Sequence, residues 1–183
     1  MSLDITFTLN DSDLEHFREL MQRAVARAES VAEADIKRNT ALAIEELENK
    51  TLPEFVAVRV AKLRELVQML DDKDWQLPAE ERKAVLSSLA YFCEPADLVP
   101  DHIPVLGYMD DAIMIELLVR DLAENFSTYE EFCTFRTAEL HRRGAEATVS
   151  QEDWLATKRR ELHRKLRDNR AARRPGRVFS RFF

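Results

Sequence analysis

The chain has 183 residues, of which 45% are apolar and 33% charged, a balance typical of a globular protein long enough to bury a core without disulfides or metal ions. Its three glycines, Gly107, Gly144 and Gly176, are too far apart for a glycine-rich phosphate-binding loop and too few for a sheet protein with many tight turns. The net charge of −7 conceals an asymmetry, because residues 158–183 contain eleven basic and two acidic residues while the rest of the chain is acidic.

The N-terminal part of the sequence changes from a strand pattern to a helix pattern. Residues 3–9 alternate between apolar and polar side chains, so we expect residues 1–10 to form a short extended segment. Ser12 to Glu15 match a capping box, which predicts that a helix begins there. The apolar stripe that follows shifts near Asp35, so residues 12–49 form either one long bent helix or two helices.

A second helix is predicted after Thr51, because Pro53 lies at an early helical position. Its apolar residues also recur at spacings of three and four, as they do in coiled coils. We therefore expect residues 11–70 to form an N-terminal helical hairpin. Packing within one chain is favoured, and a homodimer through these helices remains the alternative.

The middle of the sequence predicts a helical core over residues 71–147. Residues 71–75 read as a polar turn, and Pro78 opens the next helix. Residues 111–125 are apolar nearly all round, which is typical of the buried centre of a domain. Ser127 is expected to cap the following helix, which Gly144 ends.

A basic helix and tail over residues 148–183 complete the predicted all-α helical bundle. Ser150 is expected to cap this last helix, whose apolar face is thin, and Pro175 breaks it. The two cysteines, Cys93 and Cys133, show no pairing pattern, and the sequence lacks a signal-peptide pattern and an apolar run long enough to span a bilayer. We therefore expect a cytoplasmic protein.

The most specific motif extends from Tyr91 to Asp111. Three prolines lie between Cys93 and Tyr108, so we predict a proline-rich loop between two core helices. The residues that define this loop are Tyr91, Pro95, Pro100, Ile103, Pro104 and Gly107. Four aspartates, Asp97, Asp101, Asp110 and Asp111, lie at fixed offsets from them.

This segment resembles the YkvA-like family, a bacterial domain of unknown function. The pattern of that family is aromatic-x-x-Pro-x-Asp-Leu-Ile-Pro-Asp-x-Ile-Pro-x-Leu-Gly-x-x-Asp-Asp, and Val99 stands where isoleucine is usual. The resemblance covers residues 85–122 and leaves out the N-terminal helices and the basic tail. It implies a small helical domain, often described as membrane-associated, with no established reaction.

The four aspartates have two interpretations. If the loop folds back over the helix start, their carboxylates would converge as ligands that suit Mg²⁺ or Mn²⁺, and such a metal would activate water for hydrolysis. Alternatively, Asp97 and Asp101 make turns, and Asp110 or Asp111 caps the next helix. The second interpretation is favoured, so we expect no cofactor, and the sequence indicates no catalytic residue.

The C-terminal tail combines positive charge with aromatic side chains. Its candidate residues for an anionic partner are Arg173, Arg174, Arg177, Phe179, Arg181, Phe182 and Phe183. The partner is a protein, an anionic lipid surface, or the acidic body of the protein itself; the phenylalanines favour lipid, and the acidic remainder disfavours nucleic acid. The leading hypothesis is thus a non-enzymatic interaction or scaffold module that associates peripherally with the inner membrane surface. The alternative is a divalent-metal-dependent hydrolase.

Overall fold

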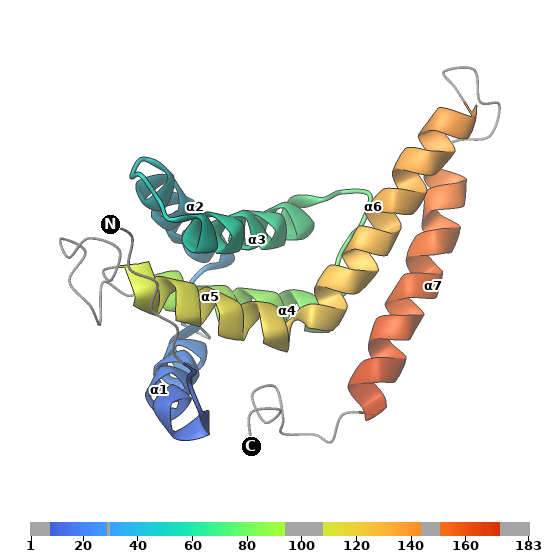
Figure 1. The fold of residues 1–183 in the computed structure, drawn as a ribbon. Coiled ribbons are helices and arrows are strands. Elements are labelled where there is room, and N and C mark those ends of the chain that lie inside the picture. Colours follow the sequence, from blue (N-terminus) through green and yellow to red (C-terminus); the bar gives the residue numbers. More distant parts are fainter. Residues whose placement is uncertain (1–7, 29, 94–107, 144–150, 173–183) are drawn as a thin grey trace.

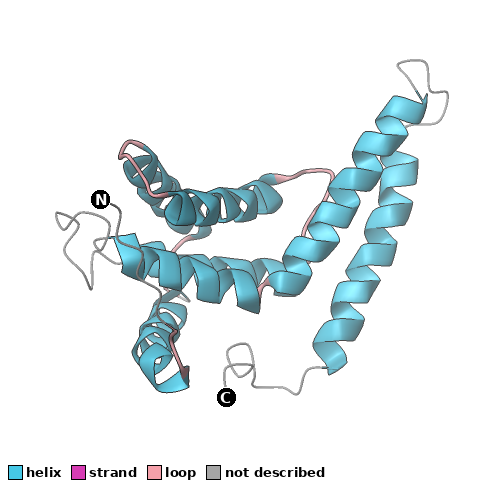
Figure 2. Ribbon diagram, viewed as in Figure 1, coloured by secondary structure: helices cyan, strands magenta, loops and turns pink. Residues whose placement is uncertain are grey.

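The computed structural model describes residues 8–28, 30–93, 108–143 and 151–172. These residues form seven α-helices and one short 3₁₀-helix, with no strand among them (Figures 1 and 2). The predicted all-α bundle is confirmed. The expected extended segment lies mostly in residues 1–7, which are outside the described residues.

The N-terminal region forms two separate helices, α1 (Asp11–Ala28) and α2 (Glu33–Glu48). The predicted capping box is displaced, because Asn10 rather than Ser12 caps α1. The Asn10 Oδ1 atom accepts hydrogen bonds from the backbone amides of Ser12 at 2.9 Å and Asp13 at 3.2 Å. In return, the Asp13 carboxylate accepts a hydrogen bond from the backbone amide of Asn10 at 2.9 Å. Asparagine caps helices as well as serine does, so the helix begins two residues earlier.

Helices α2 and α3 (Glu54–Asp71) pack against each other above α4 (Ala79–Leu89) and α5 (Met109–Asp121), while α1 crosses below them (Figure 1). Helix α1 contacts α4 and the 3₁₀-helix η1 (Ala90–Cys93), which places it away from the α2–α3 pair. Pro53 and Pro78 stand directly before α3 and α4, as expected for residues whose fixed φ suits a helix start.

Helices α6 (Ala123–Arg143) and α7 (Gln151–Ala172) lie side by side at one end of the molecule (Figure 1). The predicted cap at Ser127 is wrong, because α6 begins immediately after Leu122. The Thr128 hydroxyl bonds to the Glu124 carbonyl at 2.7 Å, as in a helix interior. Core packing decides the conformation of this segment, because it buries Phe126, Tyr129 and Phe132. The segment is therefore helical from Ala123 onward, although its polar residues resemble a helix start.

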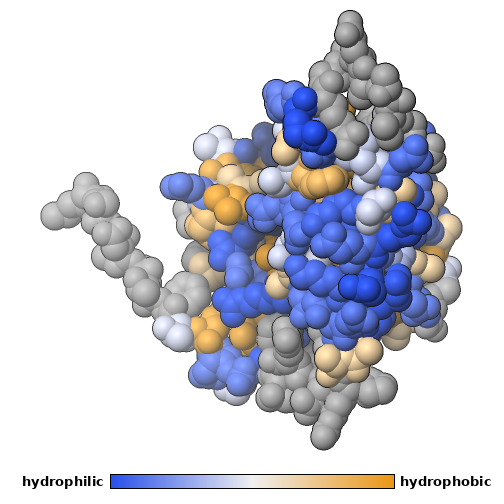
Figure 3. Space-filling view, turned by 90° about the vertical axis from the view of Figure 1, so that its right-hand side faces the viewer, coloured by the Kyte–Doolittle hydropathy of each residue, from blue (hydrophilic) through white to orange (hydrophobic). Residues whose placement is uncertain are grey.

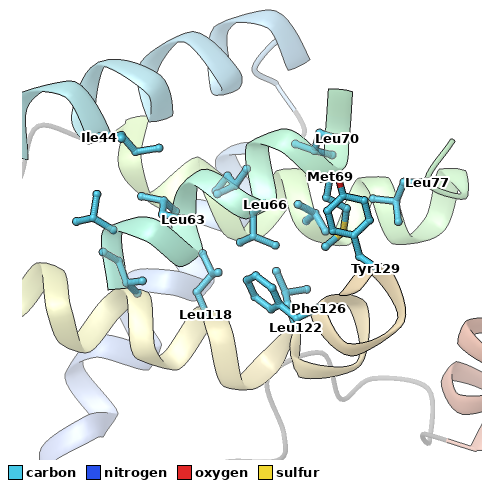
Figure 4. Packing of buried hydrophobic residues seen from close by; sticks show 14 of the residues in the cluster. Ile44, Leu63, Leu66, Met69, Leu70, Leu77, Leu118, Leu122, Phe126 and Tyr129 are labelled. Atoms are coloured by element: carbon cyan, nitrogen blue, oxygen red, sulfur yellow. The ribbon is translucent and has the colours of Figure 1, made fainter. Parts of the chain in front are cut away.

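The core extends through the whole bundle. Figure 4 shows the part of it around α3, α5 and α6. Leu63, Leu66 and Met69 of α3 face the side chains of α5 and α6. Helix α7 adds Leu155, Leu162 and Leu166, which are at most 3% exposed, so its thin apolar face still completes the core. None of the described helices is both long and apolar enough to cross a bilayer.

Candidate functional site

The basic residues on the inward side of α7 form ion pairs with acidic residues of the protein itself. The Lys158 ammonium lies 2.7 Å from one oxygen of Glu131 on α6, and the Lys165 ammonium lies 3.1 Å from the other. Hydrogen bonds from Lys158 and Lys165 lower the pKa of the Glu131 carboxyl, and the bond to Glu131 raises the pKa of Lys158. Lys158 also pairs with Glu161 at 3.2 Å, so two carboxylates balance the two ammonium groups. The two lysines therefore hold α7 on α6 and carry little net charge to a partner.

The C-terminal end of α7 is fixed to the start of α4 by a buried carboxylate. Glu81, only 6% exposed, accepts a hydrogen bond from Asn125 of α6 at 3.0 Å and one from the Arg170 Nε at 2.7 Å. Arg170 also donates to the Glu80 carbonyl at 3.1 Å. We call Glu81, Asn125 and Arg170 the Glu81 cluster; it joins three helices that are far apart in the sequence.

The middle of α7 covers the turn between α3 and α4. Arg159 donates to the Asp74 carbonyl at 2.8 Å, and the His163 ring packs edge-on against Trp75 with ring centroids 4.6 Å apart. Burial lowers the pKa of His163 to about 4, and the positive charges of Arg159 and Arg167 act in the same direction. The imidazole is therefore neutral at pH 7, so it is an uncharged part of the helix interface.

The stability of the protein is expected to depend on His163 between pH 6.5 and about pH 4. In this window the unfolded chain binds a proton at this residue and the folded chain does not, so stability falls as the pH falls. Substitution His163→Phe removes this dependence. Urea unfolding should show that the stability of the natural protein relative to the variant is lower at pH 5 than at pH 7. If the difference in stability between the two proteins were the same at both pH values, the lowered pKa of His163 would be contradicted.

The outward side of α7 carries three arginines at positions 160, 164 and 167, here called the outer arginine stripe. All three side chains are exposed, and their spacing of four and three residues places them on one face of the helix. Arg160 donates to the Thr157 hydroxyl at 3.3 Å. Within the described residues none of the three forms an ion pair. The end of the molecule formed by α6 and α7 is strongly hydrophilic (Figure 3).

Of the four aspartates predicted as metal ligands, the structure describes two. Asp110 and Asp111 lie in the first turn of α5, where negative charge favours helix formation; Asp110 is buried and Asp111 half-buried. In the described part of the chain no group of three His, Cys, Asp or Glu side chains is arranged to hold a metal ion. Asp97 and Asp101 lie outside that part, so the four-aspartate metal site stays a prediction.

The other predicted site residues are mostly outside the described ranges. Tyr91 is half-buried in η1, with its ring at right angles to that of Phe92 and the centroids 5.3 Å apart. The remaining loop and tail candidates are not among the described residues: Pro95, Pro100, Ile103, Pro104, Gly107, Arg173, Arg174, Arg177, Phe179, Arg181, Phe182 and Phe183. A homodimer through the N-terminal helices also stays a prediction.

A family model described as "Protein of unknown function (DUF1232)" matches residues 81–117. The match begins at Glu81 in α4 and ends within α5, so it spans about a fifth of the chain and includes the whole proline-rich motif from Tyr91 to Asp111. It supports a family of unknown function, while the YkvA-like label stays a prediction. Neither the curated proteins nor the solved structures contain a match to this chain.

Counting the basic residues along the sequence did not distinguish the outer arginine stripe from the other basic residues. A helical projection carries the missing signal, because Lys158 and Lys165 fall on one side of α7 and Arg160, Arg164 and Arg167 on another. The Glu81 cluster has no comparable signal, since its members are 44 and 89 residues apart.

Proposed function

We propose that this protein is a non-enzymatic interaction module that attaches peripherally to the inner membrane surface through α7 and the residues after it. The outer arginine stripe is the observation that supports this function. Lys158, Lys165 and Arg170 are held by acidic residues of the protein itself, whereas the stripe directs three positive charges to solvent. A straight helix with its charges on one face brings them to a flat anionic surface together.

The size of the expected attraction follows from the number of charges. Each basic residue near an anionic membrane contributes about 1 kcal/mol, so three contribute roughly 3 kcal/mol, or on the order of 100-fold in binding. Asp168, exposed on the flank of the stripe, subtracts from this total. In the sequence, three phenylalanines and four arginines follow α7, and their insertion at the lipid interface would add an apolar contribution.

Replacing Arg160, Arg164 and Arg167 by alanine is expected to weaken binding to vesicles rich in phosphatidylglycerol by on the order of 100-fold. The measurement is co-sedimentation at fixed salt, with phosphatidylcholine vesicles as the uncharged comparison. The matched control replaces Arg38, Arg64 and Arg142, which are also exposed but are paired with acidic residues. The control removes the same net charge and should bind as the natural protein does.

Equal weakening in both triple variants would mean that only net charge matters, and this would overturn the assignment to α7. A chain that ends at Arg170 keeps the Glu81 cluster and lacks residues 171–183, and we expect its binding to anionic vesicles to be lost. Unchanged binding by this shortened chain would remove the tail from the proposal.

The alternative function is a divalent-metal-dependent hydrolase that uses the motif aspartates. Its support is the position of Asp110, a buried acidic side chain at the start of α5, directly after the proline-rich segment. This alternative predicts that Mg²⁺ or Mn²⁺ raises the melting temperature, since a ligand at 100 times its Kd stabilises by about 2.7 kcal/mol. The shift should disappear in Asp101→Asn. If the metal ions left the melting temperature of the natural protein unchanged and Asp101→Asn were only less stable, the hydrolase alternative would be excluded.

A further inference from the structure

A pocket of about 260 Å³ lies between the start of α2 and the outer side of α4. Its apolar wall consists of Val31 and Ile36 on the α2 side and of Ala79 and Leu86 on the α4 side. A cavity of roughly 150 Å³ already admits a benzene ring, so this pocket is large enough for one phenyl ring.

The charged groups at the edge of the pocket are engaged within the protein. Arg82 Nε lies 3.1 Å from one Glu33 oxygen, and a second guanidinium nitrogen binds the other oxygen. The third nitrogen donates to the Leu70 carbonyl at 2.7 Å. Lys83, which also lines the pocket, is not free either. The apolar wall is therefore the part of the pocket that is suited to hold an occupant.

Helix α7 ends beside this pocket. Arg170 donates to the Glu80 carbonyl at 3.1 Å and to the Glu81 carboxylate at 2.7 Å. Glu80 directly follows Ala79, a wall residue, and lies seven residues before Ser87, a pocket residue on the same face of α4. The chain that leaves α7 therefore starts next to the helical turn that forms one side of the pocket.

The sequence after α7 contains a side chain that the pocket can take up. Residues 173–183, which lie outside the described residues, include Phe179, Phe182 and Phe183. Phe179 comes seven residues after Ala172, and seven residues reach up to about 23 Å at roughly 3.3 Å each. A helix with its side chains is about 10–12 Å across, so this length is sufficient to pass around α4. The shorter tether gives Phe179 a higher effective concentration at the pocket than the two later phenylalanines have.

The charge beside the pocket is complementary to the tail. The Glu80 side chain is 80% exposed and reaches Arg170 only at 4.0 Å. Arg173 and Arg174 follow Arg170 by three and four residues, so an exposed carboxylate lies where the basic tail begins. An exposed ion pair contributes little by itself, and the buried ring therefore supplies most of the affinity.

We propose that the pocket between α2 and α4 binds the phenyl ring of Phe179 of the same chain, which holds the tail on the protein when no membrane is present. Burial of one tethered phenylalanine favours the bound tail over the free tail by on the order of tenfold. The binding of the ring stands by itself, whereas its consequence for membrane attachment rests on the proposed function. Phe179 has to leave the pocket before it reaches lipid, which weakens membrane binding by the same factor.

The first test is methyl NMR of the full chain without lipid, because an aromatic ring shifts the signals of methyl groups that lie against it. We expect Phe179→Ala to move the methyl signals of Ile36, which lines the pocket, and to leave those of Ile115, which does not, unchanged. The matched control is Phe183→Ala, which removes the same kind of ring from the same tail and should leave Ile36 unchanged. Unmoved Ile36 signals in Phe179→Ala would overturn the proposal. Equal shifts in both variants would also overturn it, because the pocket would then not select Phe179.

The second test fills the pocket and measures binding to vesicles rich in phosphatidylglycerol. Ser87→Trp places a ring in the pocket from its edge, so the tail is free and binding is expected to tighten by on the order of tenfold. Ser127→Trp adds the same side chain at an exposed position of α6 and should bind as the natural protein does. Circular dichroism checks that both variants are folded.

The two tests separate this inference from the proposed function. Unchanged vesicle binding by Ser87→Trp would overturn the regulation of membrane attachment, even if Phe179→Ala moved the Ile36 signals. If neither the natural protein nor Ser87→Trp bound vesicles, the proposed function would fail. The Ile36 signals would still decide whether the pocket holds Phe179, because they are measured without lipid.

Discussion

Replacement of Trp75 by alanine is expected to lower the free energy of unfolding by about 3–5 kcal/mol, the range for a large aromatic side chain removed from a core. Trp75 is fully buried, with its ring centroid 5.0 Å from that of Phe132 and 5.9 Å from that of Tyr129. Together with His163, it joins the turn after α3 to both α6 and α7. The cavity left by alanine would separate three elements at once.

Urea unfolding measures this loss, and the second tryptophan supplies the control. Trp154 is only half-buried, near the far end of the α6–α7 pair, where its ring packs against Phe135 with centroids 5.7 Å apart. The variant Trp154→Ala should therefore lose clearly less stability than Trp75→Ala. If the two variants were equally stable, Trp75 would not be the link between the turn and the C-terminal helices.

The turn that positions Trp75 is built from its polar neighbours. Asp72 accepts hydrogen bonds from the backbone amides of Asp74 at 2.9 Å and Trp75 at 3.0 Å, and its carboxylate is also bound by Tyr129 and Arg136. Gln76 then adopts a φ of 49°, in the left-handed region. The sequence predicts this turn from its aspartates, but nothing local indicates that the tryptophan within it points into the core.

The elements that were predictable from sequence are those whose signals are local. Apolar spacing predicted the helix around Val60, a run that is apolar nearly all round predicted the helix around Ile115, and Pro53 and Pro78 marked where helices begin. The start of α6 was missed because the burial of Phe126 outweighs the capping tendency of Ser127. Such a competition is decided by tertiary packing, which a local pattern does not contain.

The candidate site was likewise predictable only in part from the sequence. The basic character of α7 follows from the sequence, and helical geometry assigns Arg164 and Lys158 to different faces. Which face meets the acidic body depends on α6, where Glu131 lies opposite Lys158 and Lys165. The inward residues of α7 are thus paired with acidic residues of the protein, and only the outward ones support an external partner. The partner of residues 173–183, which lie outside the described residues, stays a prediction.

Substitution Arg170→Ala is expected to lower the free energy of unfolding by about 2–3 kcal/mol. It leaves the Glu81 carboxylate, on a side chain that is 8% exposed, with the neutral Asn125 amide as its remaining side-chain donor among the described residues. The loss is set below that for a fully buried pair because Arg170 is 40% exposed. Arg142→Ala, which breaks a pair between the exposed Arg142 and Glu139, is the matched control and should have a much smaller effect on stability. The double variant Glu81→Gln with Arg170→Ala should recover part of the loss, since it removes the buried charge. A double variant as unstable as the sum of its single variants would show that the charges of Glu81 and Arg170 do not interact, and that α7 is held by its leucines alone.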